Sequence, residues 1–261
     1  MLEIKNLKVD INNKDIINGI SLSFSKWKTY FLLGKNGSWK SSLAFTIAWH
    51  PKYRVSSWDI VLSWRVITNA KPEERSKMWI FLSFQSVPEI RWIKLGEYLR
   101  TIYNSALTSK NHEAKWLSSF LFKRFITKYL NELSISEAFL ERDLNVGFSW
   151  WEKRKIELLQ IKLLNPEFII LDEIDSGLDI DAFKIVAKNL SEMKTPENTL
   201  IFITHNFNLL DYTAVDEVFV MDKGALIDSW KIELIENIKK NWYCGYCHDQ
   251  TENCDTETKC A

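Results

Sequence analysis

The chain has 261 residues, and its 34 Lys and Arg balance 34 Asp and Glu, so its formal net charge at pH 7 is zero. This length allows one large or two modest domains, and the neutral charge argues against nucleic-acid binding as the main function. No apolar run approaches the roughly 18 residues of a membrane span, and no leader pattern follows Met1, so we expect a cytoplasmic protein outside the membrane.

Two residue counts are unusual. Gly occurs 8 times and Trp occurs 12 times. Together they make 20 of the 261 residues, which is close to the usual share of glycine alone, about 7%. One interpretation is a Trp-rich protein. The other is that many of the tryptophans stand at glycine positions.

Near the N-terminus, residues 2–9 and 16–24 alternate between apolar and polar as β-strands do. A strand-like run at 29–33 then leads through a loop into a helix-like run at 41–48. The loop differs at one position from the P-loop pattern G-x-x-x-x-G-K-[ST] and lies in the strand–loop–helix context that this pattern requires. Its residues are Gly34, Lys35, Asn36, Gly37, Ser38, Trp39, Lys40, Ser41 and Ser42.

A P-loop predicts a site for nucleotide phosphates. Its backbone N–H groups and the N-terminus of the following helix bind phosphate oxygens. Lys40 would reach the β- and γ-phosphates, and the Ser41 hydroxyl would bind Mg²⁺. Trp39 stands where the pattern has glycine, and its indole would crowd the phosphate. Either this loop does not bind nucleotide, or Trp39 is not the residue that the cell inserts.

The middle of the chain reads as a helical insertion between two α/β halves. A short helix at 71–78 precedes an apolar strand that ends at Gln85. From 94 to 140 apolar residues recur at helical spacing, and a further helix extends to about residue 164. We therefore expect an all-helical insertion that spans about residues 91–165.

The last third predicts apolar strands that end in polar side chains. One strand begins at Phe168 and ends in Asp172 and Glu173, and another at 199–204 is followed directly by His205. The other expected elements are an amphipathic helix at 180–190, a strand pair at 215–221 and 225–227, and a helix at 231–240.

These motifs, in this order, resemble those of the ABC-type ATPases: a P-loop, a Q-loop glutamine, an S-G-G-E type signature, a Walker B strand and an H-loop histidine. The resemblance covers about residues 1–240. It implies an α/β fold with a P-loop RecA-like core, an antiparallel β subdomain and a helical subdomain. The matching residues after the P-loop are Gln85, Ser149, Trp150, Trp151, Glu152, Asp172, Glu173 and His205.

The resemblance also implies roles in binding Mg²⁺ and hydrolysing ATP. Asp172, Ser41 and Gln85 would hold Mg²⁺, Glu173 would orient or deprotonate the attacking water, and His205 would contact the γ-phosphate. Two copies would pair head to tail. The signature residues 149–152 and Asp179 of one copy would then complete the ATP site of the other.

Finer features are similar to the SufC family, the ATPase subunits of the SUF iron–sulfur cluster scaffold. They are the sequence D-E-I-D-S-G-L-D at 172–179 and the P-E-I that follows Gln85. This resemblance implies SufB and SufD as partners, docked near residues 85–94 with Ile90 and Ile93 as apolar anchors. Two alternatives stay open: an ATPase subunit of an ABC transporter, and a scaffold that has lost nucleotide binding.

Against the family pattern, most of the tryptophans replace glycine. Our hypothesis is that the source reads the UGA codon as glycine and that this sequence renders the same codon as tryptophan. Trp116 and Trp242 do not fit the pattern clearly. The positions that do are Trp27, Trp39, Trp49, Trp58, Trp64, Trp79, Trp92, Trp150, Trp151 and Trp230.

The tail at 241–261 contains all the cysteines of the chain: Cys244, Cys247, Cys254 and Cys260. Its C-x-x-C spacing is compatible with a zinc or iron–sulfur site. The alternative is a tail with free thiols, because disulfides are rare in a reducing compartment.

Overall fold

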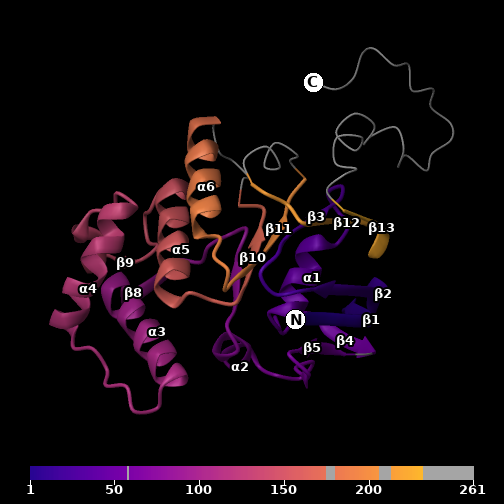
Figure 1. The fold of residues 1–261 in the computed structure, drawn as a ribbon, viewed down its shortest axis with the longest axis horizontal. Helices are drawn as coiled ribbons and strands as arrows, with labels where there is room; N and C mark the ends of the chain where they lie inside the picture. The colour runs from indigo at the N-terminus through magenta and orange to yellow at the C-terminus, as the bar shows by residue number, and fades with distance from the viewer. Residues whose placement is uncertain (58, 175–179, 206–212, 232–261) are drawn as a thin grey trace.

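The computed structural model describes residues 1–57, 59–174, 180–205 and 213–231. The elements form two larger sheets and, beside them, a mainly helical region that contains a third, two-stranded sheet (Figure 1). The strands are β1 (Leu2–Ile11), β2 (Lys14–Phe24), β3 (Thr29–Leu33), β4 (Arg54–Ser57), β5 (Ile60–Leu62), β6 (Arg65–Val66), β7 (Ile80–Ser83), β8 (Ile90–Lys94), β9 (Asp143–Leu144), β10 (Phe168–Asp172), β11 (Thr199–Ile203), β12 (Glu217–Asp222) and β13 (Ala225–Lys231). The helices are α1 (Lys40–Ile47), α2 (Pro72–Lys77), α3 (Leu95–Lys110), α4 (Ser119–Glu132), the short 3₁₀ helix η1 (Glu137–Glu141), α5 (Trp150–Leu164) and α6 (Ile180–Met193).

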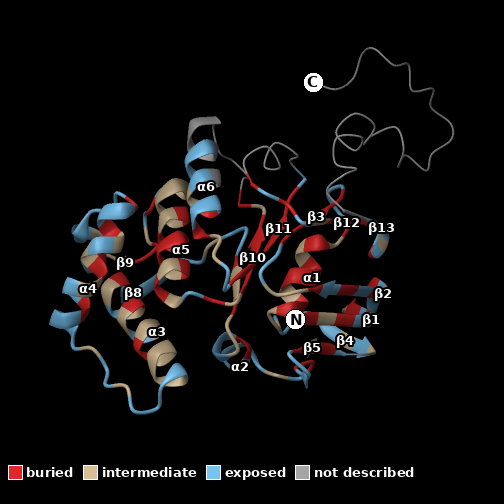
Figure 2. Cartoon of the chain, in the orientation of Figure 1, coloured by how far each residue is buried: buried red, intermediate tan, exposed pale blue. Residues whose placement is uncertain are grey.

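The central sheet has the strand order β13-β12-β3-β11-β10-β7, and all its neighbours are parallel except β12 and β13. Strands β3, β10 and β11 are buried along their whole length, as Figure 2 shows in red. Strands buried on both faces read as continuous apolar runs, which is why the sequence predicts them without alternation. Their carboxyl ends meet at one edge of the sheet, which brings the polar residues that follow each strand together.

The second sheet is antiparallel, with β1 between β2 and β5. Helix α1 buries Leu43, Ala44 and Ile47 in a core that includes residues of both sheets. The phosphate loop and its helix are therefore held between two sheets. The fold is α/β, as the sequence predicts.

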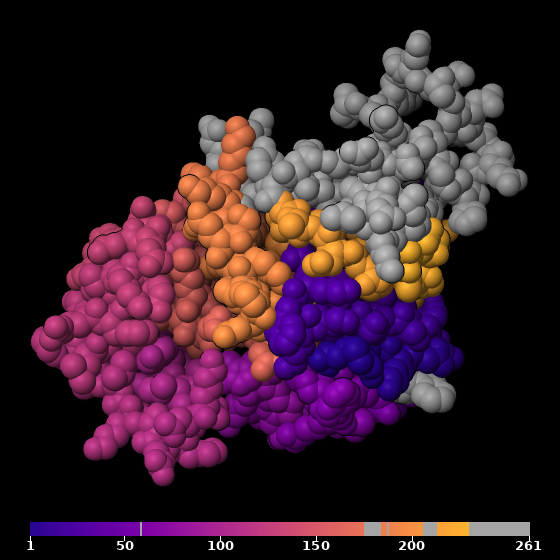
Figure 3. Space-filling view, in the orientation of Figure 1, coloured from indigo at the N-terminus to yellow at the C-terminus, as the bar shows by residue number. Residues whose placement is uncertain are grey.

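The region from β8 to α5 forms a second core with the other face of the central sheet. It appears in magenta beside the sheet region in Figure 3. The expectation of an all-helical insertion is wrong, because β8 pairs with β9 in a two-stranded sheet. Every residue of β8 is exposed, so its sequence carries no burial signal. The expected 225–227 strand is also too short, since β13 continues to Lys231.

Candidate functional site

The loop between β3 and α1 surrounds a buried lysine. The Nζ atom of Lys40 donates hydrogen bonds to the carbonyl oxygens of Gly34 (2.7 Å) and Lys35 (2.9 Å) and to Ser38 Oγ (3.2 Å). Burial lowers the pKa of Lys40, and the charges of Glu173 and Asp172 oppose this effect. A cation at the start of a helix, inside a loop of backbone amides, is an arrangement that binds phosphate.

Close packing at Gly34 fixes the path of this loop. A Cβ atom there would lie 2.2 Å from the carbonyl oxygen of Met221 and 2.7 Å from Ser38 Oγ. The position therefore requires glycine, and it has glycine.

Ser41 and Asp172, which come from α1 and the end of β10, meet beside the loop. Ser41 Oγ donates to Asp172 Oδ1 at 2.9 Å. Asp172 is fully buried, and its Oδ2 has no hydrogen-bond partner among the residues that the structure describes. Burial raises the pKa of Asp172 to about 6. A buried carboxylate oxygen without a partner next to a hydroxyl fits a hard cation such as Mg²⁺, which keeps waters and takes few protein ligands.

Glu173 joins two of the other predicted residues. Gln85 Nε2 donates to Glu173 Oε2 at 2.5 Å, and His205 Nδ1 lies 3.5 Å from Glu173 Oε1. A hollow of about 270 Å³ adjoins them. It is lined by Asn36, Gly37, Trp39, Lys40, Ser41, Ser42, Gln85 and Glu173. Residues far apart in the sequence are thus gathered at one edge of the sheet.

The signature residues lie elsewhere, at the start of α5. Ser149 Oγ accepts from the Glu152 backbone N–H at 3.3 Å, and Glu152 Oε2 accepts from the Ser149 N–H at 2.7 Å. This reciprocal pair is a capping box. None of residues 149–152 lines the hollow beside Lys40. Asp179 and the four cysteines lie outside the described residues.

Six tryptophans have a left-handed backbone. Two of the twelve, Trp58 and Trp242, lie outside the described residues. Six of the other ten have φ between 62° and 73°. Only a few per cent of non-glycine residues have positive φ, and those are enriched in Asn, Asp and His rather than Trp. The six are Trp27, Trp39, Trp49, Trp64, Trp79 and Trp92.

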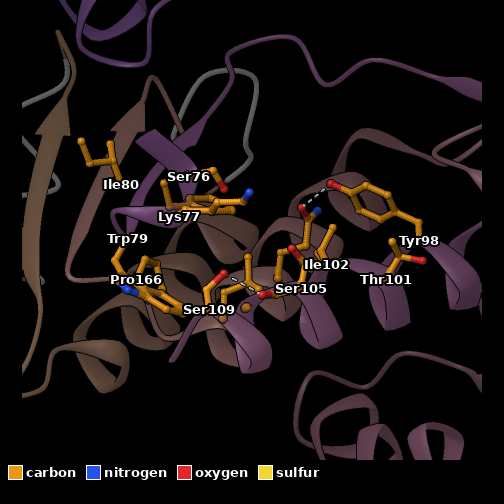
Figure 4. Close-up of a pocket in the computed structure, with 14 residues that line it drawn as sticks. Ser76, Lys77, Trp79, Ile80, Tyr98, Thr101, Ile102, Ser105, Ser109 and Pro166 are labelled. Atoms are coloured by element: carbon orange, nitrogen blue, oxygen red, sulfur yellow. Dashed lines mark hydrogen bonds between the residues drawn. The ribbon is translucent and has the colours of Figure 1, made fainter. Parts of the chain in front are cut away.

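A larger hollow of about 310 Å³ lies between α3 and the region around β7 (Figure 4). Trp79 lines it, with Lys110 Nζ 4.1 Å from the ring centroid, and so does Tyr98, whose hydroxyl contacts Gln160 at 3.2 Å. Of the predicted site residues that the structure describes, none lines this hollow. The indole of Trp79 forms part of its wall, so glycine at position 79 would enlarge it.

Sequence reasoning missed Arg154 and Glu157, a buried ion pair on α5 with a separation of 2.5 Å. The available signal was a pair of opposite charges three residues apart within an otherwise apolar helical face. That spacing also occurs on solvated helix surfaces, so it does not by itself indicate a buried pair.

Comparison with known proteins agrees with this geometry. A family model described as ABC transporter matches residues 17–176. A probable ATP-dependent transporter, ycf16, from Antithamnion sp. is 41% identical over 93% of this chain and 96% of its own length. A probable ABC transporter ATP-binding protein from Streptococcus pyogenes serotype M3 is 36% identical over 95% of this chain and 96% of its own.

Solved structures share the fold at lower identity. A nucleotide-free ATP-binding cassette from an ABC transporter has a TM-score of 0.72 at 22% identity, covering 92% of this chain and 94% of its own. A dimeric post-hydrolysis cassette bound to ADP and Pi has a TM-score of 0.72 at 14% identity, covering 88% and 98%. The chain belongs to the ABC transporter family and carries its ATP-binding domain. Within that family, a Synechocystis relative named probable ATP-dependent transporter is 37% identical over 93% of this chain and 94% of its own.

Proposed function

We propose that this chain is the ATP-hydrolysing subunit of a cytoplasmic SUF iron–sulfur cluster scaffold, acting through residues 1–240 with a helical subdomain inserted over about 91–165. The observation that carries the catalytic part is the cluster of Lys40, Ser41, Gln85 and Glu173 around one hollow, with Asp172 hydrogen-bonded to Ser41. The SUF assignment rests on the sequence D-E-I-D-S-G-L-D at 172–179 and on the segment that follows Gln85.

In this proposal each residue has a separate task. Lys40 and the loop amides bind the β- and γ-phosphates. Ser41 and Asp172, with Gln85, hold Mg²⁺, which would offset phosphate charge. Glu173 takes a proton from the attacking water, and its contacts with Gln85 and His205 orient it.

A second copy of the chain completes each site in this proposal. Ser149 and the backbone at 150–151 begin helix α5, whose N-terminus would face the γ-phosphate bound by the partner copy. The separation of residues 149–152 from the hollow beside Lys40 supports a role toward another molecule. Glu152 is engaged in capping Ser149, so we assign it a positioning task.

We further propose that the natural chain has glycine at the six left-handed tryptophan positions, with the same codon read as glycine at Trp150 and Trp151. A left-handed non-glycine residue costs about 1 kcal/mol or more. Six such residues would cost on the order of 6 kcal/mol, comparable with the whole stability of a domain, about 5–15 kcal/mol. Three of the six, Trp27, Trp64 and Trp92, are 61%, 86% and 91% exposed, so burial of their rings offers little compensation.

This predicts an unusual stability result. Changing Trp27 and Trp64 to glycine together should raise the free energy of unfolding by about 1–2 kcal/mol, because glycine adopts positive φ without steric cost. Urea unfolding measures the change. Trp116 is a matched control, since it is 57% exposed and its φ is not positive. Trp116→Gly should lower the free energy of unfolding or leave it unchanged. Equal destabilisation by all three changes would contradict the glycine assignment.

Partner choice separates this function from its rivals. The family relatives are named as transporter proteins, which favours a membrane partner. Within the described residues no helix is both long and apolar enough to cross a bilayer, so a transporter assembly would need a separate membrane subunit. A scaffold without nucleotide binding would require the tryptophan at position 39 to be genuine. Purification with a β-helical SufB- or SufD-like protein supports our proposal, and purification with a transmembrane protein contradicts it.

The docking surface predicts the effect of two substitutions. Ile90 and Ile93 on β8 are 39% and 43% exposed, beside the Gln85 segment. Ile90→Asp with Ile93→Asp should reduce capture of a SufB- or SufD-like partner at least about tenfold, because two charges replace apolar contact area. Phe120→Asp, on exposed α4 surface, is the control and should not change capture. Equal capture by both proteins would overturn this docking face.

A further inference from the structure

Helix α5 is connected to the Gln85 segment by one buried arginine. Arg154 is 1% exposed. Its Nη1 donates to Ser83 Oγ (3.2 Å) and to the Phe84 carbonyl oxygen (2.9 Å), and its Nη2 donates to the Gln85 carbonyl oxygen (3.2 Å). Nη1 also contacts Glu157 Oε2 at 2.5 Å, which compensates the buried charge. The guanidinium therefore binds the backbone where β7 ends.

These contacts set the direction of the Gln85 side chain. A guanidinium presents its donors in a rigid planar fork, so bonds to two successive carbonyls fix the orientation of the peptide between them. The side chain of Gln85 leaves this anchored backbone and reaches Glu173 Oε2 at 2.5 Å. Within the described part of the chain, Arg154 makes no hydrogen bond to Glu173 or to Lys40. The hydrogen-bonded route from Arg154 to Glu173 therefore runs through Gln85, while the charge of Arg154 also acts on Asp172.

Two more contacts link the same segment to α5 and to the loop before it. Lys153 Nζ lies 2.7 Å from Glu89 Oε1, and Asn145 Nδ2 donates to the Pro88 carbonyl oxygen at 2.9 Å. Arg154 follows Ser149 by five residues, or about 7–8 Å along the helix axis. Short, direct contacts thus join the first turns of α5 to the backbone of the Gln85 segment.

We propose that Arg154 is a positioning residue that aligns the Gln85 amide with Glu173 and couples the orientation of α5 to ATP hydrolysis. This inference rests on the proposed function, in which Glu173 acts on water and the start of α5 faces the partner's nucleotide. Arg154 has no contact with substrate in this role. It acts on turnover and leaves nucleotide binding to the phosphate loop.

The test uses the full chain with glycine at positions 39, 150 and 151 as the active parent. Arg154→Met should lower kcat about 10- to 100-fold, because a displacement of about 1 Å can cost that much, while the Kd for ATP stays within about threefold. Arg154→Lys keeps the charge but loses the planar set of guanidinium donors. Its kcat should lie between that of the parent and that of the Met variant. Lys162→Met removes another α5 cation, which pairs with Glu132 at 3.0 Å on the surface. The kcat of this control should match that of the parent.

Two further variants distinguish positioning from simple packing. Glu157→Gln removes the ion pair and leaves the bonds from Arg154 to the carbonyls, so its kcat should stay within about threefold of the parent. In a Gln85→Ala background, Arg154→Met should have little additional effect on kcat, because both changes interrupt the same route to Glu173. Additive losses would show that Arg154 does not act through Gln85.

The outcomes that overturn the inference are specific. They are an unchanged kcat in Arg154→Met, an equal loss in Glu157→Gln, or a parallel loss of ATP affinity. Where Arg154→Met does not fold because Glu157 is left unpaired, Arg154→Lys carries the test, and its unchanged kcat overturns the inference. An inactive parent would instead reject the proposed ATPase function, so the two failures are distinguishable.

Discussion

Replacing Trp39, Trp150 and Trp151 by glycine is expected to produce Mg²⁺-dependent ATP hydrolysis at least about 100-fold above that of the sequence with tryptophan. Trp39 lines the hollow beside Lys40, at φ 72°, in the position where the loop must approach a phosphate. Trp150 and Trp151 occupy the first two positions of α5, the end that the proposed pairing places against the nucleotide of the partner copy. Phosphoryl transfer depends on positioning, so displaced phosphates lose most of the rate. Phosphate release with SufB- and SufD-like partners present measures this result.

A glycine at an unrelated position provides the control. Trp116→Gly changes an exposed residue without positive φ and should leave hydrolysis at the level of the unmodified sequence. Nucleotide binding separates the two parts of the effect. Glycine at 39 alone should restore ATP binding, and glycine at 150 and 151 is then needed for ATP-dependent pairing of two copies. A triple variant that binds no nucleotide would reject the P-loop assignment.

Glu173→Gln, in the chain with those glycines, should lower ATP turnover about 10²- to 10⁴-fold and leave ATP binding intact. The amide keeps the shape of the side chain and can still bond Gln85, but it cannot accept a proton from water. Lys40, Ser41 and Asp172 are unchanged, so the phosphate and Mg²⁺ contacts remain. Single-turnover hydrolysis and equilibrium ATP binding, measured on the same protein, separate the two effects.

A surface carboxylate supplies the comparison for Glu173. Glu132 lies on α4 and pairs with Lys162 at the surface, at 3.0 Å. Glu132→Gln should not change turnover, since exposed ion pairs contribute little. Turnover of Glu173→Gln within a few-fold of this control would show that another group activates the water.

Much of the fold follows from simple patterns. Continuous apolar runs predict β3, β10 and β11, because these strands are buried on both faces. The P-loop pattern also predicts where α1 begins. Residues after strand ends, such as Glu173 and His205, lie together because parallel strands share one carboxyl edge. Periodicity and chain order were sufficient for these features.

Other features depend on contacts that the sequence does not reveal. Strand β8 is exposed throughout and forms by pairing with β9, so its apolar residues do not show the burial pattern that marks the other strands. The bonds from Arg154 to the carbonyls of residues 84 and 85 join segments about 70 positions apart. Charge spacing alone cannot distinguish such an arginine from one on a solvated surface. The positive φ angles of the six tryptophans are likewise visible only in the structure. The low count of glycine and the high count of tryptophan already indicate that glycine belongs at many tryptophan positions.

The most direct test of the proposed active ATPase is the identity of residue 39 in protein from the native source. Peptide mass spectrometry across residues 34–42 reads this position without assuming any codon table. We predict the residue mass of glycine, which completes the P-loop sequence and agrees with φ 72° at this position. Finding the mass of tryptophan at residue 39 would contradict the account and would favour a scaffold that does not bind nucleotide.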